Sequence, residues 1–212
     1  MERADLPRSH RWAGWSAIAA VALFALGNAL WAFQQPAPDA SGAELVAFYT
    51  DLSGEIEAGG LISLTSIAIF GVFASAFRSV LIDLEGDELL ANIAFGGMIL
   101  GLAAGLGAEG INMAAALRAG DGELTEPVAI ALFDISYFFG SSGAGIGFGL
   151  FTFATGAAAL RANALLPRWL AIAAVVVGAA LITPLTGWVL GEYAAGPSCL
   201  LLLFLGVKLL RG

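Results

Sequence analysis

The chain has 212 residues, of which 59% are hydrophobic and only 12% are charged, with 17 acidic and nine basic residues. About a quarter of the residues of a soluble domain are charged, so this composition excludes an ordinary soluble protein and indicates a membrane protein. The nine basic residues form no cluster and no pattern of alternating aromatic and basic side chains, which excludes nucleic-acid binding. A single cysteine, Cys199, excludes an internal disulfide.

Six apolar stretches follow one another along the chain, and a hydrocarbon core of about 30 Å is crossed by about 20 helical residues. The first stretch is longer than the core of a signal peptide and no small-x-small cleavage site closes it, so we expect it to be retained. We therefore expect an all-α bundle of six transmembrane helices, forming one domain (residues 12–210) behind a short tail (residues 1–11). The predicted spans are Trp12–Phe33, Ala58–Val80, Leu89–Leu117, Pro127–Leu160, Trp169–Leu190 and Ala194–Leu210.

The basic residues predict the orientation of the bundle, because short cytoplasmic loops collect Lys and Arg. With the N-terminus inside, eight of the nine basic residues fall on the cytoplasmic side and only Arg118 falls outside. The five tryptophans fall at predicted span boundaries, as expected for rings that prefer the headgroup level. Both termini are therefore expected in the cytoplasm.

The longest outer segment, residues 34–57, contains a helix-start signal. Ser41 precedes Glu44 by three residues, which is the spacing of a capping box, and an apolar stretch follows. This pattern predicts a short helix lying at the outer membrane interface, with an irregular loop as the alternative.

The fourth apolar stretch, at 34 residues, is too long for a simple crossing. Its middle, residues 140–149, is rich in glycine and serine. One interpretation is a broken helix whose loose backbone lines a cavity. The other is a continuous, tilted helix with a face of small residues.

Two acidic residues, Glu109 and Asp134, lie inside apolar stretches, where a carboxylate is costly and is therefore a candidate functional group. Helix arithmetic places both about 10 to 12 Å below the outer ends of one predicted hairpin. If the carboxyls meet, repulsion and burial leave them sharing one proton, or a hard cation replaces that proton. Each acid continues a stripe of small, helix-packing residues, which are Gly97, Gly101 and Gly105 before Glu109 and Ser141, Gly145 and Gly149 after Asp134.

Further polar side chains fall at a similar depth and extend this pair to a candidate polar or ion site. The layer can equally be a set of interhelical hydrogen bonds that hold the bundle together. The candidate site comprises Glu109, Asp134, Asn28, Asn112, Ser141, Thr183 and Thr186.

Enzymatic chemistry is less well supported. The sequence before Glu109 lacks the Gly-x-Gly-Asp motif of intramembrane aspartyl proteases, and the one histidine, His10, lies in the tail and excludes haem ligation in the spans. No cofactor is expected. The pattern favours a small-solute or proton-coupled ion carrier, with a non-catalytic subunit that binds a lipid, a second copy or another membrane protein as the alternative.

The segment Leu165–Leu170, which contains Leu-Pro-Arg-Trp, precedes a valine-rich span and a final helix ending in Lys208 and Arg211. With the outer segment around Glu44, it resembles a bacterial family of six-helix membrane proteins of unknown function. The resemblance implies six helices in a bacterial inner (plasma) membrane, and it implies no activity and no site residues.

Overall fold

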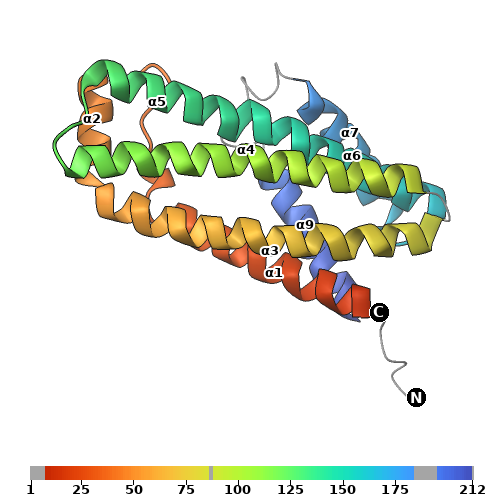
Figure 1. Cartoon of the computed structure of the whole chain (residues 1–212). Coiled ribbons are helices and arrows are strands. Elements are labelled where there is room, and N and C mark those ends of the chain that lie inside the picture. The colour runs from red at the N-terminus through yellow and green to blue at the C-terminus, as the bar shows by residue number, and fades with distance from the viewer. Residues whose placement is uncertain (1–7, 86–87, 184–194, 212) are drawn as a thin grey trace.

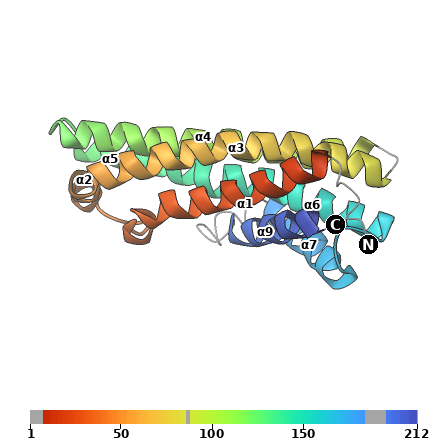
Figure 2. The same cartoon turned by 90° about the horizontal axis from the view of Figure 1, so that it is seen from below.

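The computed structural model describes residues 8–85, 88–183 and 195–211, and within these ranges the chain is helical with short turns and contains no strand. Long helices lie side by side along the molecule (Figure 1), and a second view shows α1, α7 and α9 on one side of them (Figure 2). The packed neighbours are α1 with α3, α3 with α4, α4 with α6, α6 with α7, and α9 with α1. The bounds of these helices are Arg8–Ala29 (α1), Ser53–Glu85 (α3), Glu88–Gly120 (α4), Ala144–Ala162 (α6), Arg168–Ile182 (α7) and Ala195–Arg211 (α9).

Among the described residues, four helices are long and apolar enough to cross a membrane. The last two predicted spans correspond to α7 and α9, whose 15 and 17 described residues extend about 22 and 26 Å, less than a hydrocarbon core of about 30 Å. Residues 184–194, which include Pro184 and Thr186, lie outside the described residues. The described helices therefore establish four candidate spans: Arg8–Ala29, Ser53–Leu84, Glu88–Gly120 and Glu126–Ala162.

The fourth candidate span is continuous and contains one irregular turn. Helix α5 (Glu126–Phe138) runs through a π-helical turn, η2 (Phe139–Gly143), directly into α6. Proline at the start of α5 suits the first turn of a helix, where its missing N–H has no partner to lose. Of the two interpretations of this stretch, the structure shows the unbroken helix. A π-turn contains one residue more than an α-turn, so it changes which face of α6 points inward.

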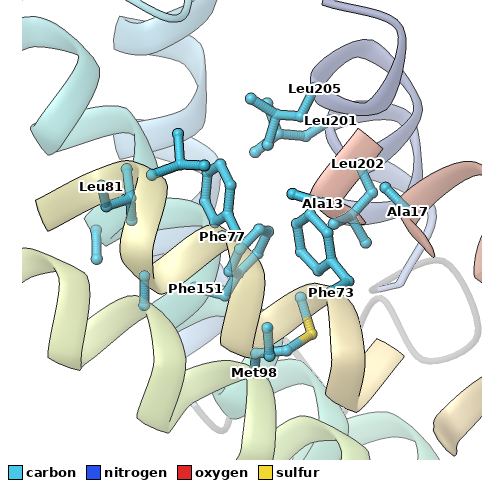
Figure 3. Close-up of a cluster of buried hydrophobic side chains, with 14 of the residues drawn as sticks. Ala13, Ala17, Phe73, Phe77, Leu81, Met98, Phe151, Leu201, Leu202 and Leu205 are labelled. Atoms are coloured by element: carbon cyan, nitrogen blue, oxygen red, sulfur yellow. The ribbon is translucent and has the colours of Figure 1, made fainter. Parts of the chain in front are cut away.

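The main core lies where α1, α3, α4, α6 and α9 meet (Figure 3). Phe73 and Phe77 of α3 stack with ring centroids 5.1 Å apart, and Phe151 of α6 meets them at 5.9 and 5.8 Å. Met98 of α4 is also fully buried in this cluster. These aromatic rings fill the space between helices that glycine and alanine hold close together elsewhere.

The short helix α2 (Gly42–Asp51) packs on α4 and α5 and covers the end of the bundle away from the main core. Both halves of the capping box are present, since the Ser41 side chain accepts from the Glu44 N–H and the Glu44 carboxylate accepts from the Ser41 N–H at 2.8 Å. The predicted short helix therefore forms. Its apolar side chains join a second cluster with residues of α4, α5 and the start of α3.

The two described chain ends lie at the same end of the molecule. Gly14 of α1 lies against Leu210 of α9, where a Cβ atom on Gly14 would stand 2.6 Å from the leucine side chain. Arg78 of α3 reaches across to α4 at this end, donating to Asn92 Oδ1 at 2.8 Å and pairing with Glu88 at 3.3 Å. Most of the basic residues of the described chain thus lie at this end, and α2 lies at the other (Figure 1).

Candidate functional site

Glu109 is the one carboxylic acid among the described residues whose side chain is buried in the bundle, with 7% of its surface exposed. It lies on the side of α4 that faces α3, where three contacts follow one another. Gly60 of α3 lies against Met113, Ser63 lies beside Glu109, and Ile67 lies near Gly105. The antiparallel packing of the two helices therefore presents Glu109 to Ser63.

Ser63 connects this acid to a third helix. Its side chain is fully buried, and a Cβ atom on Gly27 of α1 would stand 2.6 Å from its hydroxyl oxygen. The hydroxyl is thus enclosed between α1 and α4. Glycine at position 27 is what allows α1 to approach so closely, because any larger residue would meet the serine.

Several buried polar atoms that lack a hydrogen-bond partner lie around the segment of α3 from Gly59 to Ser63. Among the described residues, the buried side-chain atoms without a hydrogen-bond partner are Ser63 Oγ, Glu109 Oε2, Trp31 Nε1 and Thr155 Oγ1. The first three belong together, because Trp31 lies against Gly59, one helical turn from Ser63 on the same face of α3. A buried polar atom left unpaired costs about 1 to 3 kcal/mol, and because the Ser63 hydroxyl and the Glu109 carboxyl face each other, a small adjustment lets one serve as the partner of the other.

A second polar cluster closes the site toward α2. Tyr49 of α2 is fully buried and donates a hydrogen bond of 2.9 Å to Asn112 Oδ1 of α4, one turn beyond Glu109. Ser136 of α5 also faces the Tyr49 hydroxyl. Burial raises the pKa of Tyr49 to about 12, an effect that the Ser136 hydroxyl partly offsets. Tyr49 therefore stays a neutral hydrogen-bond donor near neutral pH.

Asp134 does not join Glu109. It lies 8 residues after the start of α5 and is exposed, because the buried face of α5 is occupied by Ala129, Phe133 and Ser136. Glu109 lies 11 residues before the end of α4, so the depths below the helix ends are about 16 Å for Glu109 and 12 Å for Asp134. No hydrogen bond joins the two described side chains. A shared proton requires contact between the carboxyls, and the structure does not bring them together.

The other predicted polar residues are dispersed. Three of them bond to carbonyls of their own helices: Asn28 to Phe24 O at 2.9 Å, Ser141 to Tyr137 O at 2.6 Å, and Thr183 to Ala180 O at 2.6 Å. Thr183 is exposed, and Thr186 lies outside the described residues. Of the predicted polar layer, Glu109 and Asn112 are thus the two residues that lie on one buried face of one helix.

The predicted glycine stripes have separate neighbours. Gly97 and Gly101 lie against α6, where the contacting residues include Gly147. Gly105 has only an ordinary contact with Ile67 of α3, while Gly149 faces Gly178 of α7. Gly145 is buried in α6.

Sequence reasoning missed Tyr49 and Ser136 as site residues. The signal for Tyr49 is the spacing of Leu45, Phe48 and Tyr49, which places all three on the inner face of α2. Ser136 has no signal of its own, since its role depends on which face of α5 turns inward. Among the residues that the structure describes, no group of three His, Cys, Asp or Glu side chains could hold a metal ion.

Over the residues that the structure describes, the fold and site define an all-helical protein with four helices of membrane-spanning length and one buried acid, Glu109. No protein-family model, curated protein or solved structure matches the chain.

Proposed function

We propose that the chain is a six-span protein of a bacterial inner membrane with both termini in the cytoplasm, and that it is a small carrier in which Glu109 binds a proton or cation. The observation that carries the proposal is the buried Glu109 carboxyl, which faces the Ser63 hydroxyl of α3 and forms no ion pair among the described residues. An isolated carboxylate in a medium of low dielectric is costly, so such a group holds a proton or a cation.

The position of Glu109 suits this role. The continuous helical span from Glu126 to Ala162 has 37 residues and a length of about 55 Å. If a hydrocarbon core of about 30 Å is centred on this span, about 12 Å of helix extends beyond the core at each end. Asp134 then lies at the headgroup level, where an exposed carboxylate is hydrated. Glu109 lies inside the core and is buried between helices, so its carboxyl is shielded from the headgroup region. Asp134 is thus an ordinary residue of the membrane boundary. Burial of Glu109 is costly, and binding of a proton or cation would account for it.

The glycine faces argue against the alternative of a non-catalytic subunit held by those faces. Gly97 and Gly101 pack against α6 within the chain, and Gly149 packs against α7. These surfaces are therefore occupied, and a second copy or another membrane protein cannot use them without opening the bundle.

Infrared spectroscopy of the protein in lipid nanodiscs tests the binding group. We expect a protonated carboxyl band at neutral pH that is lost in Glu109→Gln and retained in Asp134→Asn, the matched control at the exposed position. Addition of Na⁺ or K⁺ identifies a cation that replaces the proton, because the band then decreases. A spectrum that is the same in the wild type and in Glu109→Gln contradicts the proposed site.

Transport is tested in proteoliposomes that contain a pH-sensitive dye and carry an imposed K⁺ diffusion potential. The wild type and Asp134→Asn are expected to move protons, and Glu109→Gln is expected to fall to the rate of empty liposomes. Equal rates for all three proteins refute the carrier. Labelling of a cysteine introduced at Glu123, in a Cys199→Ala background, separately tests whether the turn between α4 and α5 faces outward.

A further inference from the structure

Two adjoining surface hollows lie at the end of the molecule where the described chain ends meet. The first has a volume of about 510 Å³ and lies between α6 and α7, and the second, of about 320 Å³, lies between the α6–α7 turn and α9. They share Asn163 and Leu166, and we refer to both together as the basic hollow. Its remaining lining residues are Ala159, Leu160, Ala164, Leu165, Pro167, Arg168, Ile172, Phe204 and Lys208.

We propose that the basic hollow binds the headgroup of an anionic phospholipid of the cytoplasmic leaflet. The inference rests on the membrane insertion proposed above and is independent of any role for Glu109. Both sites lie in one bundle, but the α6–α7 turn, which lines the basic hollow, lies at the end opposite α2 (Figure 1).

Charge is the first argument. Arg168 and Lys208 line the two parts of the hollow from different helices, and both are exposed. In the described chain neither forms an ion pair with a carboxylate. The sequence has no Asp or Glu between Ile135 and Gly191, or after Glu192, although the whole chain carries a net charge of −8. The lining of the hollow among the described residues therefore contains two cations and no carboxylate, and the nearest described acids at this end of the molecule are those of the α3–α4 turn, where Glu88 is paired with Arg78.

The order of polar and apolar residues is the second argument. Ile172 lies one helical turn beyond Arg168 along α7, and Phe204 lies one turn before Lys208 along α9. Both turns lead away from the chain end and toward the middle of the bundle, and both apolar side chains are exposed and line the hollow. Each cation is therefore followed inward by an apolar side chain, which is the order of a phosphate headgroup and its acyl chains.

The turn between α6 and α7 adds neutral donors to the cations. Asn163 ends α6 in the left-handed conformation with φ 50°, and it lines both parts of the hollow. Helix α7 begins after Pro167 without a side-chain cap, so its first N–H groups remain available. The exposed Trp169 ring beside them suits the headgroup level. Basic pockets between helices on the cytoplasmic side commonly bind anionic headgroups.

Native mass spectrometry of the detergent-solubilised protein tests the proposal with phosphatidylglycerol and phosphatidylcholine as probes. We expect preferential retention of phosphatidylglycerol, decreasing with salt. Each cation near an anionic headgroup changes affinity about fivefold, so Arg168→Gln with Lys208→Gln should lower it roughly 25-fold. The conservative pair Arg168→Lys with Lys208→Arg should retain most of the binding. Arg118→Gln, at the opposite end of the bundle, is the matched control and should bind as the wild type does.

Three results overturn the proposal. They are equal retention of both lipids by the wild type, undiminished binding by the double Gln variant, and displacement of the lipid by inorganic phosphate at equal concentration, which identifies a free anion as the ligand. The comparison of the two lipids on the wild type needs no substitution, so it tests the proposal even if a variant misfolds. A protein that fails to enter nanodiscs contradicts the proposed membrane insertion. If the protein retains phosphatidylglycerol selectively but Glu109→Gln moves protons as the wild type does, only the proposed carrier is contradicted.

Discussion

Gly147 of α6 lies so close to Gly101 of α4 that a Cβ atom on residue 147 would stand 2.1 Å from the Gly101 nitrogen and 2.4 Å from its Cα. The same atom would lie 2.7 Å from Gly97 O. All three neighbours are backbone atoms, so no side-chain rotation relieves the clash. The two helices cross in backbone contact, which small residues permit and which van der Waals packing in a membrane favours.

We expect Gly147→Ala to destabilise the protein by about 1 to 3 kcal/mol, the usual cost of overpacking. Unfolding in denaturing detergent, followed by tryptophan fluorescence, measures the change. Gly96→Ala is the control, because a Cβ atom on Gly96 meets nothing within 4 Å. That variant should be neutral or slightly more stable, since alanine favours a helix by about 0.5 to 1 kcal/mol over glycine. Equal stability of the two variants would contradict the close crossing.

This contact also shows what the sequence could and could not predict. The spacing of four residues in Gly97 and Gly101 identified one face of α4, because an unbroken α-helix preserves that spacing. On the partner helix the same spacing selected Gly145 and Gly149, whereas Gly147 makes the contact. All three glycines lie on the regular helix α6, and Gly149 packs on α7 instead, so which face of α6 meets α4 depends on the packing of three helices, which a spacing of four residues does not report.

The candidate acids illustrate the same limit. That Glu109 and Asp134 lie within apolar helices follows from composition and helps to locate a candidate site. Whether each points inward depends on helix rotation, which Phe133 and Ser136 determine for α5 by packing inward themselves. The capping box of Ser41 and Glu44, in contrast, was predicted correctly because its two hydrogen bonds form within four residues.

Tyr49→Phe should cost about 1 to 3 kcal/mol of unfolding free energy, because it leaves Asn112 Oδ1 buried without its donor. Denaturant titration of the variant measures the loss, and hydrogen exchange of α2 should locate it at the α2–α4 contact. Thr50→Ala is the neighbouring control. Thr50 is exposed and bonds only to Val46 O of its own helix, so its loss should stay within about 0.5 kcal/mol. A Tyr49→Phe protein as stable as the control argues against a structural role for the Asn112 bond.

Alkaline pH should weaken the same contact. Burial raises the pKa of Tyr49 from 10 to about 12 in the folded protein, so the folded state holds this proton more tightly than the unfolded state. The resulting stabilisation is fully present below pH 10 and is lost as pH rises through 12. Stability measured between pH 9 and 12 should fall more steeply for the wild type than for Tyr49→Phe. Identical slopes would show that the Tyr49 hydroxyl is hydrated.

Acid should loosen the first turn of α2 through Glu44. Hydrogen bonds from the Ser41 N–H and, secondarily, from its hydroxyl lower the pKa of Glu44 below its usual 4.5. The carboxylate therefore contributes stability above pH 4.5 that is lost as pH falls through the lowered pKa. Hydrogen exchange of residues 42–46, corrected for intrinsic rates, should show protection that decreases in acid for the wild type and little pH dependence for Glu44→Gln. Asp51→Asn, at the exposed far end of the same helix, should keep the wild-type pH dependence. If Asp51→Asn removes that dependence as Glu44→Gln does, the acid response belongs to the helix as a whole and not to its cap.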